Sequence, residues 1–184
     1  AGVRAEQPHL QVQVATGDSA LVMARVLDFA ADLGLVVEQP SDPLLEAQPQ
    51  RRQPLWLLAP TGHALASRPM VQLADLAGEL FVVRDTGSTT QRVFEAALAQ
   101  AGVAIRVALR VGSREAVREA VAQGLGLGIV ADIGYVPGPG LVGIPFAEPH
   151  MATHAHLIWL ASRRDARLIR SFAAYARRAT AAQR

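Results

Sequence analysis

The sequence predicts an α/β fold with mainly parallel sheets, divided into two lobes. Short apolar runs typical of strands alternate with segments in which apolar residues recur at helical spacing. This alternation occurs in two runs separated by a proline-rich middle, and the two ends of the chain resemble each other more than the centre. We therefore expect a chain that crosses from one lobe to the other and returns.

The expected strands are short apolar segments bounded by turn residues. They lie at residues 10–14, 33–37, 55–58, 80–83, 105–111, 125–130 and 157–160. The first alternates apolar and polar residues, as a half-buried strand does. A polar stretch with three prolines leads to residues 55–58, and the Gly- and Pro-rich residues 135–140 are expected to form a loop.

The expected helices follow the strands. One begins after Asp18 or Ser19, either of which can cap it, and a single turn is expected at residues 73–76. Two more follow Gly-Ser pairs and stop at Gly102 and Gly124. The last expected helix spans residues 166–178.

Three turns share one pattern: a strand runs into glycine, a small polar residue and a helix. The turns are Gly17-Asp18-Ser19, Gly87-Ser88-Thr89 and Gly112-Ser113. Glycine allows tight turning and close approach of a ligand, and the polar residue can cap the helix. Unpaired N–H groups at a helix N-terminus favour an anion, by about 0.3–1 kcal/mol from the dipole alone. Capping alone is the simpler explanation of any one turn, whereas three together leave capping and a ligand cleft both open.

Composition removes several classes of chemistry. The chain has 184 residues, no cysteine, and 18 basic residues that are all arginine. It therefore lacks thiolate zinc sites, cysteine nucleophiles, Walker and Schiff-base lysines and Ser-Lys dyads. The net charge is only +2 and the arginines are scattered, so the basic isoelectric point is weak evidence for DNA contact. No apolar stretch approaches the roughly 20 residues that span a bilayer, and we expect no membrane association.

No catalytic or metal-binding set is evident. His154 and His156 would share one face of a strand and could bind a metal, but no third ligand has a telling spacing, so edge-strand imidazoles are the simpler interpretation. No G-x-S-x-G elbow surrounds the turn serines. We expect no enzyme, no metal and no cofactor.

Four stretches, in order and spacing, resemble the effector-binding domain of LysR-type transcriptional regulators of bacteria over nearly the full length. They are "LDFAADLGLVVEQP" (27–40), "QPLWLLAPTGHALA" (53–66), "LADLAGELFVVRDTGSTTQRVFEAALAQAG" (73–102) and "VGSREAVREAVAQGLGLGIV" (111–130). The resemblance implies a type 2 periplasmic-binding-protein-like fold, in which two Rossmann-like lobes are joined by two crossover strands and enclose a small-molecule cleft. Lobe I would be residues 1–56 with 148–184, and lobe II residues 57–147.

The resemblance also implies which residues line the cleft. They belong to the turn after the second strand, the crossing out of lobe I, the turn that opens lobe II's first helix, and the strand end before its second helix. These residues are Gly17, Asp18, Ser19, Glu38, Gln39, Asp85, Thr86, Gly87, Ser88, Thr89, Thr90, Val111, Gly112 and Ser113. Many relatives carry arginine where Gln91 stands, so direct pairing of a guanidinium with the effector is not expected at that position.

The same resemblance implies the partners. A DNA-binding domain, and the first strand of this domain, would precede the chain, so DNA would be contacted only through the missing N-terminal part. Self-association to a dimer, and to a tetramer in the full-length protein, and a cytoplasmic location are expected. Effector binding would shift the DNA-bound oligomer by differential affinity.

The effector is expected to be a small anion. "THAHLIWLASRRDARLIRSF" (153–172) and "GSREAVREAV" resemble regulators linked to aminoethylphosphonate catabolism. Hydroxyl-rich turns suit a phosphonate, but a sulfate-like or carboxylate effector fits the same donors. A solute-binding protein of the same fold that captures an oxyanion, and a small enzyme on this scaffold, remain alternatives.

Overall fold

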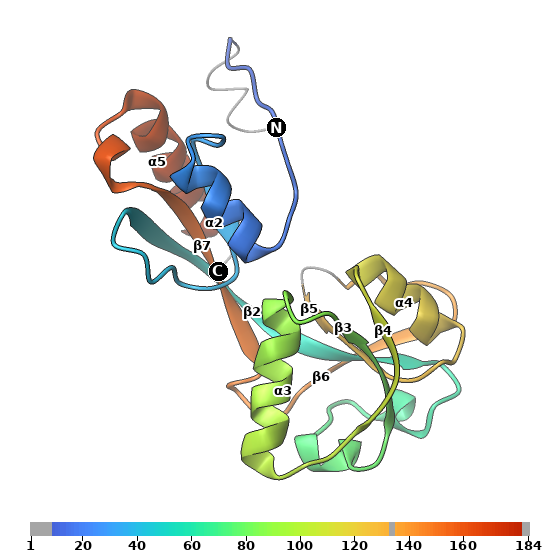
Figure 1. Cartoon of the computed structure of the whole chain (residues 1–184). Coiled ribbons are helices and arrows are strands. Elements are labelled where there is room, and N and C mark those ends of the chain that lie inside the picture. Colours follow the sequence, from blue (N-terminus) through green and yellow to red (C-terminus); the bar gives the residue numbers. More distant parts are fainter. Residues whose placement is uncertain (1–8, 133–134, 182–184) are drawn as a thin grey trace. The chain divides into compact units, whose positions relative to one another are not determined.

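The computed structural model describes residues 9–132 and 135–181 (Figure 1). The chain divides into two compact units: unit 1 comprises Ala1–Arg51 with His154–Arg184, and unit 2 comprises Arg52–Thr153. Strands β2 (Leu45–Pro60) and β7 (Ala152–Leu160) each run from one unit into the other. The expected α/β fold with two lobes and two crossover strands is confirmed. The lobe limits implied by the resemblance stay a prediction.

Unit 1 packs helices on a small sheet. Strand β1 (Gly34–Val36) pairs antiparallel with β7, and helix α2 (Ser19–Leu27) lies against β1. Helix α5 (Arg167–Ala181) follows the short 3-10 helix η4 (Ala161–Arg163). The core of this unit consists of the buried side chains Val26, Val36, Leu45, Ile158 and Leu160.

Unit 2 is built around strand β3 (Leu80–Arg84), which pairs in parallel with β4 (Arg106–Val111). Phe81 and Val83 of β3 belong to the core beside helix α3 (Thr89–Ala101), and Val82 to the core beside α4 (Arg114–Ala122). Both faces of β3 are therefore covered, which explains why its sequence is a continuous apolar run.

The rest of unit 2 packs on β2. Strands β5 (Gly128–Ala131) and β6 (Leu141–Pro145) both pair antiparallel with β2 (Figure 1). Two 3-10 helices, η1 (Ala64–Ser67) and η2 (Leu73–Leu76), precede β3, and the second is the expected single turn.

The expectation of mainly parallel sheets is wrong for the described ladders. The β3–β4 ladder is parallel, whereas β1–β7, β2–β5 and β2–β6 are antiparallel, and β2 also pairs with β7 in the larger sheet. The alternation of strands and helices indicates how strands are connected. It does not encode the direction in which a strand pairs with a crossover strand, and this direction is antiparallel in β1–β7, β2–β5 and β2–β6.

Two further strand predictions differ from the structure. Residues 10–14 are irregular, with Val12 and Val14 exposed, because no described strand pairs with them. Strand β2 begins at Leu45, well before the expected residue 55, and contains Pro49, Pro54 and Pro60. A proline is tolerated in a strand where its missing N–H is not needed by a neighbour.

Candidate functional site

The turn after β3 is a capped helix N-terminus. Ser88 is the N-cap of α3, and its Oγ accepts a hydrogen bond from the backbone N–H of Gln91 at 3.3 Å. Ser88, Thr89 and Gln91 are buried. The side chain of Gln91 does not complete a capping box: its Oε1 accepts from the backbone N–H of Arg84 at 3.1 Å and so fastens the helix to the end of β3.

The turn after β4 lies beside it. Ser113 caps α4 by accepting from the N–H of Ala116 at 3.1 Å. The N–H of Asp85 donates to the carbonyl of Val111 at 3.2 Å, because the parallel pairing of β3 and β4 places both turns at one edge. The structure therefore brings the predicted residues 85–90 and 111–113 together.

Two arginines that the sequence reasoning missed brace these turns. Arg84 donates through Nη2 to the carbonyl of Gly112 at 3.1 Å, and Arg110 donates through Nη1 to the carbonyl of Arg84 at 2.8 Å. The buried Nε of Arg84 has no hydrogen-bond partner among the described residues. The signal available in the sequence was the position of Arg84 directly before the turn.

The predicted residues of unit 1 form a second group. Asp18 caps α2, accepting from the N–H of Leu21 at 2.8 Å. Ser19 is buried, and its Oγ accepts from the N–H of Val37 at 3.3 Å. This bond places the start of α2 beside Glu38 and Gln39, so the predicted residues within unit 1 also lie close together.

The hydroxyls differ in what they already bind. Thr89 Oγ1 accepts from Nη2 of Arg92 at 3.0 Å, and Ser88 and Ser113 serve as caps. The hydroxyls of Thr86 and Thr90 have no hydrogen-bond partner within the described part of the chain. These two threonines are the donors in the turns that a ligand can bind without disturbing a cap.

The turn glycines do not adopt the left-handed backbone conformation that glycine accepts more readily than other residues. None of Gly17, Gly87 and Gly112 has a positive φ angle. A Cβ at Gly17 would lie 2.7 Å from Cδ2 of Leu21, so close packing against α2 favours glycine there. The backbone of these turns is of a kind that other residues also adopt.

The histidine pair does not form a metal site. His154 on β7 is exposed, whereas His156 is buried with its Nδ1 3.0 Å from the carbonyl oxygen of His154. Across residues 9–132 and 135–181, no three His, Cys, Asp or Glu side chains gather closely enough to hold a metal ion. Among the same residues, no helix is both long and apolar enough to cross a membrane.

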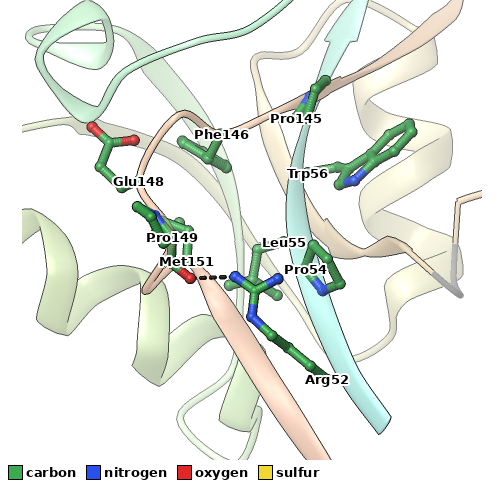
Figure 2. A pocket seen from close by; sticks show the side chains of 9 residues that line it. All are labelled: Arg52, Pro54, Leu55, Trp56, Pro145, Phe146, Glu148, Pro149 and Met151. Carbon is green, nitrogen blue, oxygen red and sulfur yellow. Dashed lines mark hydrogen bonds between the residues drawn. The ribbon is translucent and has the colours of Figure 1, made fainter. Parts of the chain in front are cut away.

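Each unit also has a cavity that the sequence did not indicate. One of about 450 Å³ in unit 2 lies beside β2 and the segment that enters β7, and Arg52 and Trp56 are among the residues that line it (Figure 2). Another of about 810 Å³ in unit 1 lies along α5 and β7. None of the predicted site residues lines either cavity.

Residues 1–181 match the family model described as LysR substrate binding domain. The chain is 31% identical over 96 residues to the HTH-type transcriptional regulator CysL of Bacillus subtilis (strain 168), a match that covers 52% of this chain and 32% of CysL. It is 35% identical over 99 residues to the phosphonates import ATP-binding protein PhnC of Anaeromyxobacter dehalogenans (strain 2CP-C), over 53% of this chain and 20% of that protein. The chain thus spans about a third or less of these relatives.

The fold is similar to that of solved regulatory domains. The CcmR regulatory domain of Synechocystis PCC6803, in complex with 2-PG, superposes with a TM-score of 0.86 at 24% identity, covering 97% of this chain and 88% of that one. At this identity the likeness shows the fold. The family match covers nearly the whole chain, and the chain belongs to the LysR substrate-binding domain family.

Proposed function

We propose that this chain is the sensing part of a transcriptional regulator, that it binds a small anion at its capped turns, and that it catalyses no reaction. The observation that carries the proposal is the adjacency of two helix N-termini, capped by Ser88 and Ser113, at one edge of unit 2. Helix N-termini present N–H groups and a positive dipole end to an anion.

Side chains around these turns support an anionic effector. The hydroxyls of Thr86 and Thr90 are available as donors. Arg84 and Arg110, which brace the turns, add positive charge that offsets the exposed carboxylate of Asp85. A phosphonate, a sulfate-like ion and a carboxylate all fit these donors. The name of PhnC favours a phosphonate, and the 2-PG bound by CcmR is the ligand of a protein with the same fold.

The remaining predicted residues belong to unit 1. We propose that Gly17, Asp18 and Ser19 contribute together with Glu38 and Gln39, as the family resemblance implies. The close packing at Gly17 and the hydrogen bond from the N–H of Val37 to Ser19 fix the backbone of these residues.

Self-association is proposed through β4. All but the last of its six residues are exposed, and Val107 and Leu109 leave 53% and 41% of their surfaces accessible. An exposed strand at the edge of a sheet can pair with another chain. DNA would be contacted through a domain outside this sequence, and the regulator would act in the cytoplasm.

Thermal unfolding in the presence of candidate anions tests this function. Phosphonates, phosphate, sulfate and small carboxylates would be compared at equal ionic strength. We expect one class to stabilise the chain by about 2–4 kcal/mol at saturation, through mass action. If none of these classes of anion stabilises the chain, the proposed anion site is contradicted. Turnover of a stabilising anion by the purified chain would instead favour the enzyme alternative.

A further inference from the structure

The cavity in unit 2 has the composition of a small-molecule pocket. Its volume of about 450 Å³ lies in the range of ligand pockets. Its walls are mainly apolar, and its charged side chains, Arg52 and Glu148, stand at separate places on the wall (Figure 2).

A hydrogen bond fixes the side chain of Arg52 at the wall of this cavity. Its Nη2 donates to the carbonyl oxygen of Pro149, which links β2 to the segment that enters β7 (Figure 2). The described residues offer no acceptor to its other N–H groups. A guanidinium that is fixed at one nitrogen and free at the others is ready to bind a carboxylate, because little side-chain freedom is lost on binding.

Trp56 forms an apolar wall. Its ring packs against Tyr135 at a centroid distance of 5.2 Å, and its indole N–H has no partner among the described residues. Pro145 and Phe146 continue this wall and suit a flat or compact apolar body.

Glu148 places a carboxylate in the wall of the cavity, apart from Arg52 (Figure 2). Its Oε1 accepts from the N–H of Leu73 at 2.8 Å, and its buried Oε2 has no partner in the described part of the chain. If a ligand placed a second anionic group beside Glu148, the carboxylate of Glu148 would repel that group in a poorly solvated environment.

We propose that this cavity is a second ligand site, separate from the turns, for a small monocarboxylate with an apolar body. The carboxylate binds the free N–H groups of Arg52, and the apolar body lies against Trp56, Pro145 and Phe146. Glu148 disfavours dicarboxylates. The site shares no residue with the turns, so substitutions can test the two sites separately.

Trp56 provides a direct test. The chain has two tryptophans, so Trp159→Phe leaves Trp56 as the sole indole. Phenylacetate is titrated against this variant while the emission of Trp56 is followed, and circular dichroism checks that the variant is folded. Calorimetric titration of the unmodified chain gives the affinity without any substitution. We expect a saturable change in emission and matching heat, with phenylacetamide and phenylsuccinate binding at least about tenfold more weakly.

Substitutions separate this site from the turns. Arg52→Gln is expected to weaken phenylacetate about tenfold to a hundredfold, the range for a lost charge-assisted hydrogen bond. Arg106→Gln is the matched control, because Arg106 also donates to a backbone carbonyl in unit 2, that of Gly78, away from the cavity. Arg106→Gln and Thr90→Val are expected to leave phenylacetate binding unchanged. Absence of saturable binding by both methods, equal affinity for the amide, or an unchanged affinity in Arg52→Gln would overturn the proposal.

Discussion

The capped turns of unit 2 and the capped turn of unit 1 use the same residue types but are held differently. In unit 2, parallel pairing of β3 and β4 aligns two turns, and the side chains of Arg84, Arg110 and Gln91 fasten them. In unit 1, a hydrogen bond from the N–H of Val37 to Oγ of Ser19 ties the start of α2 to the end of β1. The comparison indicates that the unit 2 turns are aligned by strand pairing, whereas the unit 1 turn is joined to its strand by a bond between a side-chain hydroxyl and the backbone.

The largest expected effect comes from removing a buried side chain of α3, the helix that begins at a unit 2 turn. Phe94 of α3 is fully buried, with ring centroids 5.3 Å from Phe81 and 6.4 Å from Phe146. Phe94→Ala is expected to lower the free energy of unfolding by about 3–5 kcal/mol, because it leaves a cavity in this core. Urea unfolding measures the loss, and Met70→Ala, at an exposed position of unit 2, is the control. A loss in Phe94→Ala no larger than that of the control would contradict the core assignment.

The next effect removes the hydrogen bond between Val37 and Ser19 in unit 1. Ser19→Ala leaves the part-buried N–H of Val37 without its acceptor, which is expected to cost about 1–2 kcal/mol. Hydrogen exchange of the Val37 amide reports the loss locally. Ser171→Ala on α5, which removes a hydroxyl without a partner in the described chain, is the control. Unchanged protection of Val37 in Ser19→Ala would show that unit 1 does not rely on this bond.

A smaller effect is expected at the cap of α3. Ser88→Ala removes the acceptor for the N–H of Gln91 and is expected to cost about 1 kcal/mol. Ser88→Asp retains a capping oxygen and should recover stability while placing a negative charge where the effector would bind. Thermal unfolding with and without the stabilising anion separates the two effects. Anion binding as tight in Ser88→Asp as in the unmodified chain would place the effector elsewhere.

The smallest effect is a pH dependence at the surface of unit 2. The N–H of Gln72, donating to Asp75 at 2.8 Å, and then the guanidinium of Arg68 lower the pKa of the Asp75 carboxyl. Since the folded pKa lies below the unfolded one, this stabilisation is present above the unfolded pKa and is lost as the pH falls through the folded pKa. Asp75→Asn should flatten the acid limb of the stability curve by less than about 1 kcal/mol. An unaltered acid limb would contradict this assignment.

The sequence predicted local features well and tertiary pairing less well. The cap at Ser88 and the stop at Gly102, where φ is 66°, depend on neighbouring residues and were predicted correctly. The antiparallel pairing of β6 with β2 and the bond from Gln91 to Arg84 depend on which segments meet in space. For the same reason the bracing by Arg110 and the cavity beside Trp56 could not be derived from residue spacing.

Calorimetric titration of the stabilising anion into the unmodified chain and into Thr90→Val tests the central claim most directly. The hydroxyl of Thr90 has no partner in the described chain, and valine keeps its shape, so the fold should be undisturbed. Thr61→Val, at an exposed position of unit 2, is the matched control. We predict that Thr90→Val weakens the anion at least about fivefold, the value of one hydrogen bond, while Thr61→Val binds normally. Equal affinities in all three proteins would contradict an effector site at the capped turn.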